Sequence, residues 1–272
     1  MRAMEVNPML KITNLHKTFH PGTVNAKHAL KGIDLHLQEG DFVTVIGGNG
    51  AGKSTLLNAI AGVWKPDVGT VEIDGVDVTS MLEHKRAKYL GRVFQDPMMG
   101  TAPDMEIAEN LAIARRRGTK RKLLWGIRKG ERDEYRELLK QLDLGLDTRL
   151  SSKVGLLSGG QRQAVTLLMA TLTEPKLLLL DEHTAALDPK TAAKVLDITE
   201  KLVVNKNLTT LMITHNMRDA IRYGNRLIMM YEGRIVVDVR GEDKANLTVE
   251  DLLNLFNKAS GSEFSNDRAM LG

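Results

Sequence analysis

The stretch Gly47-Gly48-Asn49-Gly50-Ala51-Gly52-Lys53-Ser54-Thr55 decides the fold and the chemistry of this 272-residue chain. It fits the phosphate-binding pattern G-x-x-x-x-G-K-[ST]. Glycines let backbone N–H groups approach phosphate oxygens closely, the lysine adds a cation, and the serine hydroxyl can hold Mg²⁺. A β-rich stretch at 41–46 precedes the loop, and apolar residues at helical spacing follow at 56–61, with Gly62 as a helix end. This context predicts a nucleoside triphosphate site rather than a chance glycine-rich turn.

The composition is that of an ordinary globular protein, with 42% hydrophobic and 26% charged residues and a formal net charge of +4. Cysteine is absent, which excludes disulfides, thiol catalysis and thiolate metal sites. No stretch approaches the ~18–20 apolar residues of a membrane helix, and residues 1–8 lack an apolar signal core. We therefore expect any membrane role to come through a partner.

Strand and helix patterns alternate along the chain, which predicts an α/β fold with a mainly parallel sheet and one helical insertion. Strands are expected at 10–15, 33–37, 41–46, 68–75, 89–95, 176–181 and 209–214, and a hairpin at 226–239 that turns at Glu232-Gly233. Helices are expected at 105–116, 131–142, 161–172, 191–203 and 247–256. The expected organisation is a tail at 1–9, one domain at 10–259 with a helical subdomain at about 96–170, and a tail at 260–272.

Polar residues follow three of the predicted strands at their carboxyl ends. These are Gln95, Asp181 and His215, and the phosphate loop follows a fourth strand in the same way. Ligands bind at this edge of open α/β sheets, so we expect the four motifs to meet at one site. Asp181 can hold Mg²⁺, and the adjacent Glu182 can orient the attacking water or accept its proton. The alternative is a pair of ordinary surface acids at a strand end.

Leu157-Ser158-Gly159-Gly160-Gln161 opens a predicted helix and provides a second anion-accepting helix N-terminus. The plainer interpretation is a helix cap in which Ser158 is the capping residue. One chain has no obvious need for two phosphate cradles, but a dimer that shares nucleotides between its subunits does.

The order of these motifs resembles the ATP-binding cassette (ABC) family of ATPases over about residues 10 to 240. The resemblance implies a P-loop NTPase (RecA-like) core with an antiparallel β subdomain and an inserted helical subdomain. It identifies residues 47–55 as the Walker A loop, Gln95 as the glutamine loop that touches Mg²⁺, and 157–161 as the signature LSGGQ. It further implies Walker B at 177–181, the catalytic glutamate at Glu182, a D-loop at Ala186-Leu187-Asp188, the switch histidine at His215, and an adenine-stacking ring at Phe19. His183 departs from the family, which commonly has proline there.

The family resemblance also implies partners. It predicts a head-to-tail dimer in which each ATP contacts Walker A of one subunit and Ser158–Gln161 of the other. A single cassette without a membrane span fits an importer subunit at the cytoplasmic face of the cell membrane, with separate permease subunits and an extracytoplasmic substrate-binding protein or lipoprotein. The stretch 47–52 resembles cassettes of branched-chain amino-acid-type permeases, and 181–189 resembles those paired with aromatic amino-acid-binding lipoproteins.

Other functions within the family stay open at this point. One is a soluble ABC ATPase that acts on ribosomes or DNA, although neither a second cassette nor a long coiled-coil insertion is present. Another is an exporter ATPase, because the permease largely sets the direction of transport. A regulatory subunit without catalysis would be expected to have lost Glu182 or His215, and both are present.

A basic run lies inside the predicted helical block. It contains Arg115, Arg116, Arg117, Lys120, Arg121, Lys122, Arg128, Lys129 and Arg132, with Leu123, Leu124 and Trp125 interleaved. Such a run can contact anionic lipid headgroups or permease loops, or nucleic acid, although no nucleic acid is expected as a partner here. The alternative is a solvated loop between two helices.

Overall fold

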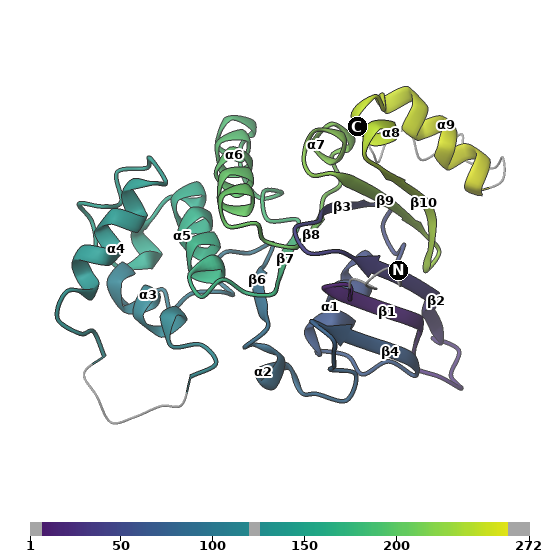
Figure 1. Ribbon diagram of the computed structural model, residues 1–272, viewed down its shortest axis with the longest axis horizontal. Helices are drawn as coiled ribbons and strands as arrows, with labels where there is room; N and C mark the ends of the chain where they lie inside the picture. The colour runs from purple at the N-terminus through teal and green to yellow at the C-terminus, as the bar shows by residue number, and fades with distance from the viewer. Residues whose placement is uncertain (1–6, 120–125, 261–272) are drawn as a thin grey trace, which may run out of the picture. The chain divides into compact units, whose positions relative to one another are not determined.

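The computed structural model describes residues 7–119 and 126–260 (Figure 1), so most of the expected N-terminal tail at 1–9 and most of the expected C-terminal tail at 260–272 lie outside the described residues. The chain divides into two compact units. The first unit contains the residues up to Arg86 and those from Asn207 onward, and the second contains Ala87–Lys206. The expected domain bounds, including the helical subdomain at 96–170, stay predictions.

An antiparallel sheet forms one part of the first unit, with the strand order β2-β1-β4-β5. Its strands are β1 (Leu10–Phe19), β2 (Lys27–Leu37), β4 (Val68–Ile73) and β5 (Val76–Asp77). The β4–β5 turn is Asp74-Gly75, in which both residues have positive φ, at 52° and 71°. This matches the Asp-Gly turn that the sequence predicted.

The other part of the first unit is built on β3 (Phe42–Ile46), in which every residue is buried. It pairs in parallel with β8 (Thr210–Ile213) and with β9 (Arg226–Tyr231), and β9 pairs antiparallel with β10 (Arg234–Arg240). A strand with parallel neighbours on both sides is buried on both faces, which explains why four of its five residues are apolar. This unit also contains α1 (Lys53–Ala61), α2 (Glu83–Arg86), α7 (Met217–Arg222), α8 (Glu242–Ala245) and one further helix near the C-terminus.

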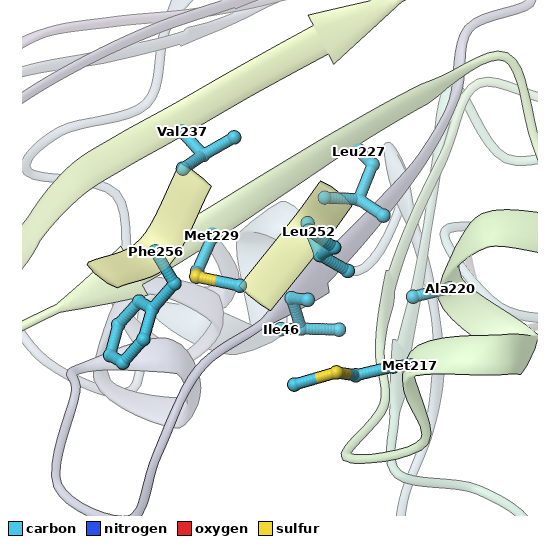
Figure 2. Close-up of a cluster of buried hydrophobic side chains, with 8 residues drawn as sticks. All are labelled: Ile46, Met217, Ala220, Leu227, Met229, Val237, Leu252 and Phe256. Atoms are coloured by element: carbon cyan, nitrogen blue, oxygen red, sulfur yellow. The ribbon is translucent and has the colours of Figure 1, made fainter. Parts of the chain in front are cut away.

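The last described helix, α9 (Val249–Ser260), packs its Leu252 and Phe256 into a hydrophobic cluster of the first unit (Figure 2). Ile46 and Met217 belong to the same cluster. Ile46 directly precedes the phosphate loop and Met217 follows His215 by two residues. The cluster therefore supports the two segments of this unit that were predicted to contact the nucleotide.

The second unit combines a short parallel strand pair with helices. The pair is β6 (Leu90–Val93) and β7 (Leu177–Asp181). The helices are α3 (Ile107–Arg115), α4 (Glu131–Lys140), a 3-10 turn at Val154–Leu156, α5 (Gly159–Thr171) and α6 (Pro189–Asn205). These elements confirm the helices predicted between 105 and 203.

Candidate functional site

The phosphate loop runs from the end of β3 into α1 (Lys53–Ala61), and two of its glycines are fixed by steric contacts. Gly47 has a φ of 150°, and a Cβ there would lie 2.2 Å from the Met230 carbonyl oxygen. Gly52 has a φ of 102°, and a Cβ there would lie 2.7 Å from the Ala29 carbonyl oxygen. Only glycine fits such positions without displacing backbone, so this loop is held tightly between β2 and β9.

Lys53 is buried at the start of α1, and its Nζ donates to the carbonyl oxygens of Gly47 at 2.7 Å and of Gly48 at 3.3 Å. The ammonium is thus held over the loop whose backbone N–H groups would contact phosphate. The Ser54 side chain lies exposed in the first turn of the same helix. Both positions suit the roles that the motif predicts.

His215 lies at the same sheet edge as the phosphate loop. The parallel pairing of β3 with β8 places Val45 beside Ile213, and the Thr214 N–H donates to the Val45 carbonyl oxygen at 3.1 Å. His215 follows directly and is exposed. The structure therefore brings together these two motifs of the first unit.

Phe19 is the last residue of β1 and is partly exposed. Its ring meets the Trp64 ring edge-on, with centroids 5.3 Å apart. The Phe19 ring is therefore already in contact with another aromatic residue. Its role in stacking on adenine stays a prediction.

In the second unit, β6 and β7 bring Gln95 and Asp181 to a common edge. Val93 pairs with Leu180, so the residues that follow both strands lie next to each other. The Arg92 guanidinium approaches the Asp181 carboxylate at 3.9 Å and lies 4.4 Å above the Phe94 ring. Arg92 was not predicted from the sequence as a site residue. That all four motifs meet at one site stays a prediction.

Glu182 follows β7 in a left-handed conformation, with a φ of 45°. Its carbonyl oxygen accepts from the Ala185 N–H at 2.9 Å, so a tight turn begins at the residue itself. Non-glycine residues adopt this conformation at a cost and persist in it where surrounding structure imposes it, as at functional sites. The backbone conformation therefore sets the direction in which the Glu182 side chain leaves the main chain.

The next residue, His183, is buried, and its Nε2 lies 3.0 Å from the Thr199 hydroxyl of α6. Burial lowers the pKa of His183 to about 4, so the ring is neutral at pH 7. The sequence marked His183 only as a departure from the family pattern. Its partner Thr199 is 16 residues further along the chain, so sequence spacing did not point to it.

The signature segment is a capped helix start. The Ser158 hydroxyl accepts from the Gln161 N–H, and the Gln161 side-chain oxygen accepts from the Ser158 N–H, both at 3.3 Å. The capping role of Ser158 is thereby confirmed. This cap uses the Gln161 N–H only. The other N–H groups of the first turn have no partner within the helix, so the predicted anion-binding role stays possible.

Gly160 has a packing role that the motif alone did not predict. A Cβ at this position would lie 2.1 Å from the Thr191 Cγ2 atom of α6. The glycine thus lets α5 approach the first turn of α6. Asp188 caps α6 and accepts from the Thr191 N–H at 3.1 Å. Hydrogen bonds from the side chain and the backbone N–H of Thr191 lower the pKa of Asp188.

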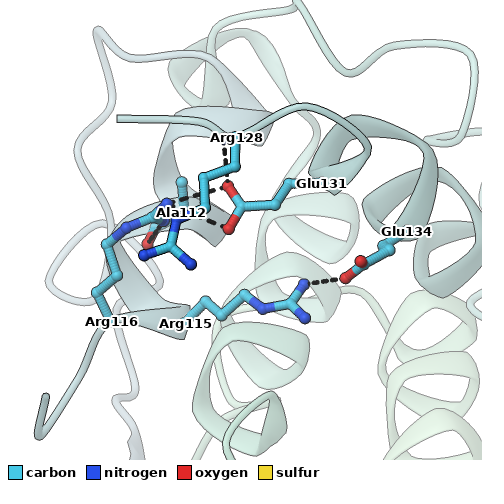
Figure 3. A network of polar contacts seen from close by, with 6 residues as sticks. All are labelled: Ala112, Arg115, Arg116, Arg128, Glu131 and Glu134. Carbon is cyan, nitrogen blue, oxygen red and sulfur yellow. Dashed lines mark hydrogen bonds and ion pairs between the residues drawn. The ribbon is translucent and has the colours of Figure 1, made fainter. Parts of the chain in front are cut away.

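Arginines of the basic run pair with glutamates of α4 (Figure 3). Arg115 pairs with Glu134, and Arg116 donates to both carboxylate oxygens of Glu131, at 3.0 and 3.1 Å. Burial raises the pKa of Glu131, but hydrogen bonds from the Arg128 N–H and the Arg116 guanidinium outweigh it and hold that pKa low.

Two further arginines of the run are also engaged. Arg117 donates to the Ala170 carbonyl oxygen at 2.9 Å, and Arg132 pairs with Glu106 at 2.8 Å. These contacts connect α3, α4 and α5, so these arginines stabilise the packing of the helices. Lys120 to Trp125 lie outside the described residues.

Within residues 7–119 and 126–260, no helix has the length and apolar character needed to cross a membrane.

Comparison with known proteins gives consistent matches. The family model described as "ABC transporter" matches residues 30–185. The tyrosine transport ATP-binding protein of Clostridioides difficile is 45% identical over 92% of this chain and 100% of its own length. The energy-coupling factor transporter ATP-binding protein EcfA2 of Acetivibrio thermocellus is 34% identical over 89% of this chain and 84% of its own.

A solved structure extends the likeness to three dimensions. The ATP-binding cassette MJ0796, in a dimeric, post-hydrolysis state bound to ADP and Pi, matches with a TM-score of 0.71 and 32% identity over 85% of this chain and 98% of its own. Along the chain, the phosphate loop comes first, the LSGGQ helix start second, and the acidic pair Asp181-Glu182 at the end of β7 third. This chain is therefore an ATP-binding, ATP-hydrolysing cassette and belongs to the ABC transporter family.

Proposed function

We propose that this ATPase energises the import of an amino acid, with aromatic amino acids as the first class to test. It would act through separate permease subunits and an extracytoplasmic substrate-binding protein. The similarity along the whole length of a tyrosine transport ATP-binding protein carries this proposal. It is supported by the presence of Glu182 and His215, which a regulatory subunit without catalysis could lose.

The proposed chemistry is attack by water on the γ-phosphorus of ATP, which breaks its bond to the β–γ bridging oxygen and releases ADP. Glu182 orients this water and accepts its proton. Lys53 balances charge on the phosphates, and His215 contacts the γ-phosphate. Phosphoryl transfer needs mainly positioning and charge stabilisation, and these side chains can supply both.

The carboxylate, hydroxyl and amide oxygens of the predicted metal-binding side chains suit Mg²⁺, which is a hard cation that binds oxygen ligands. The Asp181 side chain is partly exposed at the end of β7, and the Ser54 and Gln95 side chains are exposed. We assign these three residues to the metal. When bound, Mg²⁺ would offset the negative charge of the β- and γ-phosphates.

The proposed assembly is a head-to-tail dimer at the cytoplasmic face of the membrane. In it, Ser158–Gln161 of one subunit contacts the nucleotide on the phosphate loop of the other. Met98 and Met99, just after Gln95, are exposed by 37% and 69%. Adjacent exposed methionines form an adaptable apolar surface, which supports contact of this loop with a permease.

A pull-down from detergent-solubilised native membranes tests the proposal. Tagged Glu182→Gln protein with ATP and Mg²⁺ is the bait, and Lys53→Ala is the matched control that is expected to bind ATP poorly. Recovery of a multispanning permease is expected with the first bait and less with the second. The recovered complex is then reconstituted in vesicles, and uptake of tyrosine, phenylalanine, tryptophan and leucine is compared.

ATP-dependent uptake of an aromatic amino acid is the expected result. Uptake of leucine alone would move the substrate to the branched-chain class. ATP-dependent export from the cytoplasmic side would contradict the proposed import and identify an exporter ATPase. Recovery of ribosomes or DNA without a membrane protein would refute the transport function and favour the soluble ATPase.

A further inference from the structure

The backbone of Glu182 needs support from outside its own turn. Its left-handed conformation is unfavourable for a residue with a Cβ, and its own turn provides one backbone hydrogen bond, from the Ala185 N–H to the Glu182 carbonyl oxygen. The chain on one side of Glu182 is fixed by the pairing of β7 with β6. The chain on the other side begins with His183.

His183 anchors this second side to α6. Its side chain is buried, and its Nε2 lies 3.0 Å from the Thr199 hydroxyl, which is buried as well. Thr199 donates its one hydroxyl proton to the Val195 carbonyl oxygen at 2.8 Å. With the Thr199 proton on Val195, the neutral His183 ring donates from Nε2 to the Thr199 oxygen, and this hydrogen bond orients the ring.

The helix that receives this hydrogen bond is well fixed. Val195, Ile198 and Leu202 of α6 are buried, and Asp188 caps its first turn. The segment 182–188 is therefore attached to one helix at both ends, through Thr199 and through the Asp188 cap. A shift of the His183 ring would transmit to the adjoining Glu182 backbone.

From this geometry we propose that His183 is a positioning residue for Glu182, and that its hydrogen bond to Thr199 holds the carboxylate in its productive orientation. The proposal rests on the proposed role of Glu182 as the group that accepts the proton from water. It concerns the rate of hydrolysis and leaves the binding of ATP unaffected, because neither His183 nor Thr199 belongs to the phosphate loop.

The test uses purified full-length protein and measures kcat, the KM for ATP, the Kd of a fluorescent ATP analogue, and the melting temperature. Thr199→Val removes the acceptor hydroxyl and keeps the shape. Thr199→Ser keeps the hydroxyl and removes a methyl group. Thr171→Val is the matched control, because the buried Thr171 hydroxyl makes the same bond within its helix, to Leu167 at 3.0 Å, without a histidine partner.

We expect Thr199→Val to lower kcat about 10- to 100-fold, with the Kd and KM for ATP within about twofold of the parent. Thr199→Ser should restore kcat to within about threefold, and Thr171→Val should leave kcat unchanged even where it lowers the melting temperature. His183→Met, which fills the ring's volume without a donor, should match Thr199→Val. The double variant of His183→Met and Thr199→Val should lose no more than either single variant.

Glu182→Gln separates this proposal from the assignment of the base. If Glu182→Gln hydrolyses ATP normally, the base assignment fails, and this inference fails with it. If Glu182→Gln is inactive while Thr199→Val and His183→Met keep full kcat, this inference alone is wrong. Equal losses in Thr199→Val and Thr199→Ser would trace the effect to packing and overturn it, as would failure of both Thr199→Val and His183→Met to fold.

Discussion

Replacement of Gly160 by alanine tests the close approach of α5 to α6. The new Cβ would lie 2.1 Å from the Thr191 Cγ2 atom, far inside contact distance. Thr191 is β-branched and has few alternative rotamers in a helix, so the helices must separate or the side chain must strain. Overpacking of this kind costs about 1–3 kcal/mol, and the gain from replacing a helical glycine offsets up to about 1 kcal/mol. The difference spans about 0–3 kcal/mol, and the close contact with a stiff side chain leads us to expect a net loss of stability of about 1–2 kcal/mol.

The rescue variant sharpens this test. Thr191→Ser removes the clashing atom, and the next atoms then lie at ordinary contact distances of 3.6 Å for Thr191 Cβ and 4.0 Å for Val195 Cγ2. The serine keeps the backbone N–H that the Asp188 cap uses. The double variant of Gly160→Ala and Thr191→Ser should therefore recover the stability of the parent protein.

Thermal and urea unfolding are measured for the parent, the two single variants and the double variant. The melting temperature should fall by about 2–4 °C for each kcal/mol of lost stability in a chain of this size. Gly159→Ala is the control, because its Cβ would meet only the Leu187 Cδ2 atom, at 3.1 Å, the mobile end of a side chain. If Gly160→Ala is as stable as the parent, or if Thr191→Ser does not rescue it, the packing argument is refuted.

Three further predictions address the site and its support. Glu182→Gln should keep ATP bound in a dimer and lower phosphate release about 10²- to 10⁴-fold, and unchanged release would remove Glu182 as the base. Lys244 donates to the Gly224 carbonyl oxygen at 2.8 Å, and burial lowers its pKa from 10.5 to about 8. Because the unfolded chain then binds more protons between pH 8 and 10.5, the stability of the parent relative to Lys244→Met should rise across that interval, and a flat difference in urea midpoints would contradict this. Leu252→Ala should lower the free energy of unfolding by about 2–5 kcal/mol, because it leaves a cavity beside Ile46. Leu255→Ala, at a half-buried position, should lower it by less, and equal losses in urea unfolding would contradict this prediction.

Features that depend on neighbouring residues in sequence could be predicted. The phosphate loop needs glycines at fixed positions between a strand and a helix, and all of that information lies within about twenty residues. The Asp74-Gly75 and Glu232-Gly233 turns can also be predicted from adjacent residues, and all four residues have positive φ in the structure. The short helices α7 and α8 were not predicted, because four to six residues are too few to show a helical period.

Features that depend on distant partners could not be predicted in this way. The basic run indicated a positive surface, but Arg115 and Arg116 find their carboxylates 19 and 15 residues further along, on α4. Charge counted along a sequence does not show which charges the fold pairs. The approach of Arg92 to Asp181 has the same origin, since it arises from the pairing of two strands that lie far apart in the sequence.

One signal in the sequence could have found the role of α6. Thr191, Val195 and Thr199 are spaced four residues apart, so they lie along one face of the helix. A buried hydroxyl needs a hydrogen-bond partner, and Thr199 meets that need with the Val195 carbonyl oxygen inside the helix and His183 outside it. The methyl group of Thr191 on the same face explains why the signature helix requires a glycine at Gly160. A threonine on the apolar face of a predicted helix is thus a reason to look for a polar partner outside that helix, and in this chain the structure shows that partner to be His183.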